Sequence, residues 1–223
     1  MSQQYAVASP APSALATNKL IRNTYILLSM TLLFSALTAA VAMAMNLPSM
    51  GLLITLGGYF GLLFLTSALR NSVWGLAAVF ALTGFMGLTL GPFLNAYLQF
   101  FSNGGQLVML ALGGTGMIFL GLSGYALTTR KDFSFMGGFL MVGILVAFLL
   151  GIGAAIFSIP AMALAVSAIF ILLMSGMILY QTSAMIHGGE TNYIMATITL
   201  YVAIFNLFTS LLHLLAVFAG QER

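Results

Sequence analysis

The sequence contains no cysteine and few charged residues. Without cysteine, the chain has no disulfide framework, thiol nucleophile, iron–sulfur centre or thiolate zinc site. Asp, Glu, Lys and Arg make up only 4% of its 223 residues. A soluble globular domain carries about 25% charged residues because its surface faces water. A water-soluble fold is therefore excluded.

Acidic residues are missing from the long apolar stretches of the sequence. Asp132, Glu190 and Glu222 fall between or after these stretches, although an intramembrane carboxylate is the usual sign of an ion or proton pathway. His187 and Glu190 lack a third metal ligand nearby, so no metal site is predicted. Lys and Arg form no run long enough to follow the phosphates of a nucleic acid.

The sequence is rich in long apolar stretches, and 61% of its residues are hydrophobic. About 20 apolar residues span the core of a bilayer, and none of the stretches alternates as a barrel strand does. The prediction is an all-α membrane protein, a single seven-helix transmembrane domain over residues 24–223. The spans are expected at residues 24–45, 51–69, 74–98, 107–128, 135–157, 161–186 and 193–218.

A polar segment precedes the first span. Residues 1–23 are predicted to form a flexible cytosolic N-terminal tail. Lys19 and Arg22 stand before the span, and Ala-Val-Ala at 40–42 lies within it, so a cleaved signal peptide is an alternative. We favour a retained helix because the apolar stretch is long enough to cross the membrane.

Basic residues predict the orientation of the bundle. With the N-terminus in the cytoplasm, only Arg223 falls on the outer side, which satisfies the positive-inside rule. The C-terminus is then periplasmic. The residues on the cytoplasmic side are Lys19, Arg22, Arg70, Arg130 and Lys131.

Small residues spaced by four allow helices to approach closely where lipid offers no hydrophobic drive. Such spacing predicts packing inside the bundle, and a dimer face is the alternative. The residues concerned are Gly57 and Gly61, Gly87 and Gly91, and the series Gly143, Ala147, Gly151 and Ala155.

Neutral polar residues inside the spans are the candidate functional residues. Helical spacing places Thr199, Asn206, Ser210 and His213 on one face of the last span. One interpretation is hydrogen bonding between helices, worth about 0.6 kcal/mol per contact. The other is a polar cavity or pore among the third, sixth and seventh spans, lined by Asn95, Gln181, Asn206, Ser210 and His213.

The segment Gly121-Leu122-Ser123-Gly124 resembles the Gly-x-Ser-Gly of rhomboid intramembrane proteases, with His213 as the base. A catalytic dyad requires the two side chains to lie within about 2.6–3.2 Å. Helical rise places Ser123 and His213 on opposite sides of the midplane, on the order of 20 Å apart. We therefore expect no protease dyad and no enzyme activity.

Several motifs resemble one protein family, and the segment before the last span is the most specific of them. Together they resemble the YccA branch of the Bax inhibitor-1 (TMBIM) family over the chain beyond its tail. The motifs are Arg22-Asn23-Thr24-Tyr25, Thr83-Gly84-Phe85-Met86-Gly87, Leu90-Gly91-Pro92, Thr128-Thr129-Arg130-Lys131-Asp132, His187-Gly188-Gly189-Glu190-Thr191-Asn192-Tyr193-Ile194, Leu200-Tyr201 and Asn206-Leu207-Phe208.

This resemblance implies a bundle in the bacterial inner membrane with six helices around a central seventh. It implies that the protein binds the membrane-bound AAA protease FtsH and its partners HflK–HflC, and modulates proteolysis of membrane substrates. It also implies that the protease engages the N-terminal tail, including Lys19 and Arg22.

Other members of the family are described as pH-sensitive calcium leak channels with paired Asp residues on the sixth and seventh helices. The corresponding positions here are Gln181 and Ala203. Neither residue titrates, and neither supplies the anionic oxygen that calcium prefers. A non-enzymatic modulator of the protease is therefore the leading hypothesis, and a calcium or proton leak channel is the alternative. Neither function requires a cofactor.

Overall fold

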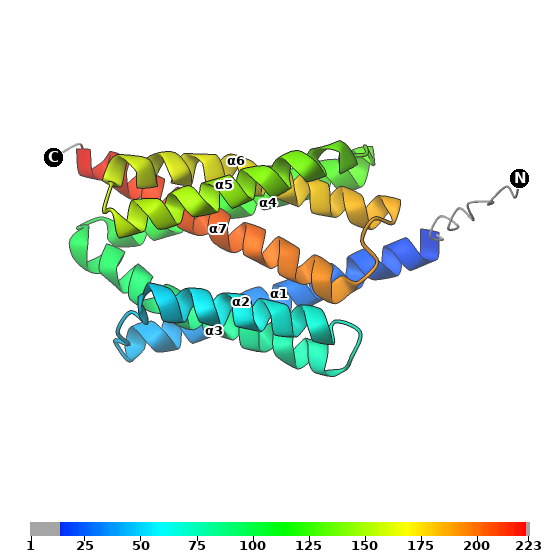
Figure 1. Ribbon diagram of the computed structural model, residues 1–223, viewed down its shortest axis with the longest axis horizontal. Helices are drawn as coiled ribbons and strands as arrows, with labels where there is room; N and C mark the ends of the chain where they lie inside the picture. Colours follow the sequence, from blue (N-terminus) through cyan, green and yellow to red (C-terminus); the bar gives the residue numbers. More distant parts are fainter. Residues whose placement is uncertain (1–13, 222–223) are drawn as a thin grey trace, which may run out of the picture.

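The structure, a computed structural model, describes residues 14–221 as a bundle of long helices without strands in this part of the chain (Figure 1). Seven helices are long and apolar enough to cross a membrane, which confirms the predicted fold. In chain order the elements are α1 (Ala14–Ala44), α2 (Gly51–Leu69), α3 (Trp74–Phe100), α4 (Gly104–Thr129), the 3-10 turn η1 (Ser134–Met136), α5 (Gly137–Ile156), α6 (Pro160–His187) and α7 (Tyr193–Gln221).

The first helix differs most from its predicted limits. It begins at Ala14 rather than at residue 24, so residues 14–23 are helical and continue the first span. They contain no Gly or Pro and include the good helix formers Ala, Leu, Lys and Arg. Lys19 and Arg22 are exposed on this extension. The remainder of the expected flexible tail lies outside the described residues.

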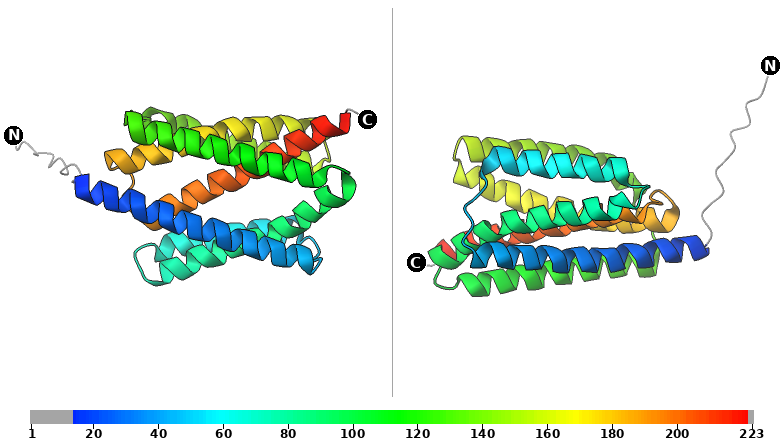
Figure 2. Two further views of the ribbon diagram at one scale, coloured as in Figure 1. Left: turned by 180° about the vertical axis from the view of Figure 1, so that it is seen from behind. Right: turned by 90° about the horizontal axis from the view of Figure 1, so that it is seen from below.

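Helix α7 lies between two groups of helices, as expected for a central helix (Figures 1 and 2). One group is formed by α1, α2 and α3, and the other by α4, α5 and α6. α7 runs diagonally between them and packs against α1, α3, α4 and α6. α2 packs mainly on α3, and α5 mainly on α6, so these two helices form the periphery.

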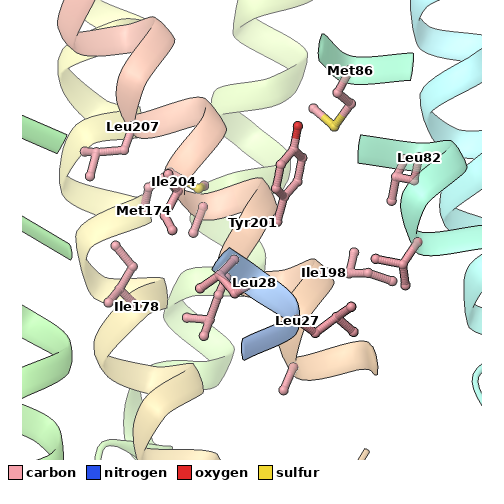
Figure 3. Packing of buried hydrophobic residues seen from close by; sticks show 14 of the residues in the cluster. Leu27, Leu28, Leu82, Met86, Met174, Ile178, Ile198, Tyr201, Ile204 and Leu207 are labelled. Atoms are coloured by element: carbon pink, nitrogen blue, oxygen red, sulfur yellow. The ribbon is translucent and has the colours of Figure 1, made fainter. Parts of the chain in front are cut away.

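Tyr201 of α7 is the largest fully buried side chain in the described part of the bundle (Figure 3). Its ring belongs to the apolar core with Leu28 and Met86. Its hydroxyl lies 2.6 Å from Ser35 Oγ of α1 and 3.3 Å from the carbonyl oxygen of Thr83 of α3, to which it donates. One side chain therefore ties three helices together.

Three sets of small residues are spaced by four along a helix in the sequence, and we call these sets stripes. Two of these stripes are used for packing inside the bundle. A methyl group at Gly87 would collide with Thr38 and Ser35 of α1, and one at Gly91 would lie 2.5 Å from Ala42 Cβ. On α5, Gly143 faces Leu173 of α6. The third stripe differs, since no described atom outside α2 lies within 4 Å of a methyl group at Gly57 or Gly61.

All charged residues that the structure describes lie at one end of the bundle, which we call the charged end. It is the end from which α1 starts, and α7 finishes at the other (Figure 1). The gathering of basic residues that was predicted from the sequence is thus present. The residues are Lys19, Arg22, Arg70, Arg130, Lys131, Asp132 and Glu190.

The hydroxyl of Tyr201 provides a test of the packing of α7. Tyr201→Phe removes both hydrogen bonds and leaves Ser35 Oγ buried without a partner, at a cost of about 1–3 kcal/mol. We expect a lower unfolding temperature in detergent micelles. Tyr125→Phe is the control, because the Tyr125 ring is 43% exposed and no described residue bonds its hydroxyl. Equal unfolding temperatures for the two variants would contradict this role of Tyr201.

Candidate functional site

One face of α7 is less covered than the rest of the helix. Thr199, Val202, Asn206 and His213 are only half-buried, whereas side chains on the other faces, such as Leu207, are fully buried. This is the polar face that the sequence predicted. It lines two hollows, one after the other along the helix.

The larger hollow, which we call the α2–α5 groove, has a volume of about 1140 Å³. α7 forms its floor through Thr199, Val202 and Asn206, and is seen in Figure 1 passing behind the space between α2 and α5. The walls are mostly Leu, Ile, Met and Phe side chains of α2, α3, α5 and α6. Its lining is therefore suited to hydrocarbon more than to water.

The smaller hollow, which we call the vestibule, has a volume of about 300 Å³ and lies among α3, α6 and α7. The polar cavity predicted from the sequence was also expected among these three helices. Its polar lining comes from Tyr97, Ser167, Thr209, Ser210 and His213, with Phe93 completing the wall. It lies toward the end of α7 that is opposite the charged end.

A hydrogen bond between Ser167 and His213 crosses the vestibule wall. Ser167 Oγ lies 2.8 Å from His213 Nδ1 and 3.0 Å from the carbonyl oxygen of Ala163. The tautomer of the His213 ring decides which of the two side chains donates. The pair joins α6 to α7.

The candidate residues do not form one cavity. Asn206 lines the groove, whereas Ser210 and His213 line the vestibule. Asn95 Nδ2 donates to the carbonyl oxygen of Met43 at 3.2 Å and ties α3 to the end of α1. Asn95 and Gln181 line neither hollow.

Gln181 and Ala203, which the family resemblance compared with paired Asp residues, are both buried. Gln181 is 5% exposed, and its Nε2 has no hydrogen-bond partner among the described residues. Ala203 is fully buried at the edge of the groove floor. Within residues 14–221, no three His, Asp or Glu side chains gather where they could hold a metal ion.

Ser123 belongs to a separate cluster of hydroxyl groups. Tyr25 of α1 donates to Ser123 Oγ of α4 at 2.9 Å, and Thr182 Oγ1 of α6 lies 3.3 Å from the same atom. Ser123 is therefore engaged with α1 and α6, while His213 is engaged with Ser167. The two residues that would form a protease dyad have different partners, in agreement with the sequence analysis.

Asn192 joins two loops at the charged end and begins α7. Its Oδ1 accepts the backbone N–H groups of Ile194 and Met195 at 3.0 and 3.1 Å. Its Nδ2 donates to the carbonyl oxygen of Arg70 and to Asn71 Oδ1 at 3.0 and 2.9 Å. The α6–α7 loop is thereby attached to the α2–α3 loop.

Ser183 attaches a third loop to the charged end. Its hydroxyl accepts the Phe133 N–H at 2.9 Å and donates to the carbonyl oxygen of Lys131 at 3.1 Å. In the same loop the Ser134 N–H donates to Asp132 Oδ1 at 2.8 Å. The Ser134 backbone and hydroxyl lower the pKa of the Asp132 carboxyl, and nearby His187 acts in the same direction. The charged end is thus a connected set of loops.

Comparison with known proteins identifies relatives along the whole bundle. A family model described as "Inhibitor of apoptosis-promoting Bax1" matches residues 17–220. The chain is 53% identical over 211 residues to "Modulator of FtsH protease YccA" of Escherichia coli strain K12, with 94% of each chain covered. The same identity and coverage relate it to "Inner membrane protein YccA" of Escherichia coli O6:H1. An uncharacterized Pseudomonas aeruginosa protein is 51% identical over 220 residues, with 99% of each chain covered.

Variants of Asn192 can distinguish its two roles, which are to cap α7 and to attach the two loops to each other. Asn192→Ala removes the cap and the loop contacts, and its loss of stability is expected to be about 1–2 kcal/mol from the cap alone. Asn192→Ser keeps an accepting oxygen that can cap α7 but loses both Nδ2–H donors, so its loss is expected to be smaller. Thermal unfolding in detergent measures both. A Ser variant as unstable as the Ala variant would contradict the capping role.

Proposed function

The chain belongs to the family of the inhibitor of apoptosis-promoting Bax1, and we propose that it is a bacterial inner-membrane protein that modulates an FtsH-type protease. The observation that carries this proposal is the 53% identity, over 94% of both chains, to the Escherichia coli modulator of FtsH protease YccA. The inner-membrane location follows from the second Escherichia coli relative. HflK–HflC are expected partners on the family resemblance.

The charged end faces the cytoplasm in this proposal. Five basic residues gather there, and the positive-inside rule favours such an arrangement. The helical extension that carries Lys19 and Arg22 then projects from the cytoplasmic surface, and the residues before Ala14 precede it. In the proposed orientation a cytosolic unfolding motor can reach the N-terminal segment, and the C-terminus is periplasmic.

The proposed mechanism is competition without catalysis. The protease engages the N-terminal segment and then meets a helix that packs along α3 and α7. Hydrogen bonds from Tyr201 and Asn192 hold those neighbours in place. Extraction is therefore slow, and the engaged protease is unavailable to other membrane substrates.

A reconstituted protease provides the test. In liposomes that contain purified FtsH and a membrane protein that it degrades, adding this chain is expected to slow degradation of that substrate several-fold. A variant lacking residues 1–13 keeps α1 whole and is expected to lose the effect and to be degraded more slowly itself. Inhibition by the full chain and the truncated chain alike would reject the N-terminal segment as the point of engagement. Absence of inhibition by the full chain would reject the proposed function.

A calcium or proton leak channel is a second candidate, favoured by the polar face of α7. Asn206 in the groove and Ser210 in the vestibule lie one helical turn apart, so the two hollows follow each other along the helix. The missing carboxylates at Gln181 and Ala203 count against it. A leak predicts ion flux in liposomes that His213→Ala or Asn206→Leu reduces. Flux no greater than in empty liposomes between pH 5 and 8 would exclude the channel.

A further inference from the structure

Two aromatic rings meet across the α2–α5 groove. Phe60 of α2 and Phe148 of α5 both line it, and their rings meet edge to face with centroids 5.6 Å apart. A transmembrane helix with its side chains is about 10–12 Å across, so it cannot pass between these two rings. A single hydrocarbon chain is thin enough to pass beside them. The groove therefore selects a slender occupant.

The lining of the groove selects an apolar occupant. Leu, Ile, Phe and Met side chains make most of its surface, and apolar cavities do not hold water. Polar groups on its lining include Thr199 and Asn206 on the floor, where Asn206 Nδ2 already donates to the carbonyl oxygen of Val202. Five of the lining residues are methionines, whose flexible side chains adapt to irregular shapes. In a bilayer, the substance with these properties is lipid hydrocarbon.

The groove is long enough for a lipid acyl chain. Along α2 its lining residues run from Thr55 to Ser67, which corresponds to roughly 18 Å of helix. The hydrocarbon of one leaflet is about 15 Å thick, half of the bilayer core. The Ser67 end lies toward the charged end, and because α2 has 19 residues, the groove extends from near that end past the middle of the helix.

A basic residue stands just beyond that end of the groove. Arg70 follows Ser67 by one helical turn, is exposed, and forms no ion pair with an acidic side chain in the part of the chain that the structure describes. Lys and Arg side chains at the ends of transmembrane helices reach the interface, where the lipid phosphates lie. We propose that the α2–α5 groove is a binding site for an anionic phospholipid, whose acyl chain lies between α2 and α5 with its phosphate at Arg70.

Photolabelling locates the acyl chain directly. The full chain is reconstituted in phosphatidylethanolamine liposomes that contain phosphatidylglycerol with a diazirine in one acyl chain. After illumination, mass spectrometry is expected to find the adducts concentrated on half-buried groove residues such as Ile144 and Val202. The comparison surface is α4, where Met117 and Leu120 are 73% and 69% exposed. Adducts spread evenly over both surfaces, or absent from the groove, would overturn the proposal.

Substitutions test the two parts of the site separately. Val202→Trp fills the groove floor and is expected to remove the groove adducts, whereas Leu120→Trp on α4 leaves them unchanged. Arg70→Gln is expected to lower the preference for labelled phosphatidylglycerol over labelled phosphatidylcholine about five-fold. Lys131→Gln removes a charge at the same end and serves as its control. If both charge variants lose this preference equally, Arg70 contributes only to the general surface charge. Its assignment as the residue that binds the lipid phosphate is then overturned.

Discussion

Inside a bilayer no water is available to a buried hydroxyl or amide, and the arrangement of α1, α3 and α7 follows from that constraint. Tyr201 brings a hydroxyl into the centre of the bundle, where Ser35 and the Thr83 carbonyl are its only partners in the described part of the chain. Those partners are within reach because Gly87 and Gly91 let α1 approach the backbone of α3. The glycines and the tyrosine thus act together. The hydrogen bonds of the Tyr201 hydroxyl depend on the close contact between α1 and α3 that the glycines allow.

Hydrogen bonds of the same kind fix the central helix along its length. Asn192 holds its start to the α2–α3 loop, Tyr201 holds its middle to α1 and α3, and His213 holds its far part to α6 through Ser167. The face between these attachments toward α2 and α5 has no comparable set of contacts. The fold therefore combines a firmly held central helix with one side that remains open to the membrane.

Much of the fold was predictable because lipid imposes a simple pattern on sequence. α2 begins and ends where its apolar stretch does, and the charged residues mark the loops at one end. The start of α1 was not predictable in this way, since residues 14–23 mix Ala, Leu and Ile with polar residues and are helical outside the continuous apolar stretch. Of the site, helical spacing identified the polar face of α7. Spacing within one helix does not fix its rotation relative to another, so it did not reveal that Asn95 faces α1 or that Ser167 pairs with His213.

The continuity of α1 has a mechanical consequence. Because the helix runs unbroken from Ala14 to Ala44, a force applied at its first turn is transmitted along the axis into the membrane-spanning part. There α1 lies against α3 and α7 for much of its length, so its contacts are loaded in parallel, in shear, rather than peeled apart one at a time. A helix whose contacts are loaded in shear resists pulling far better than a helix with the same contacts that is joined to the pulled segment by a flexible hinge.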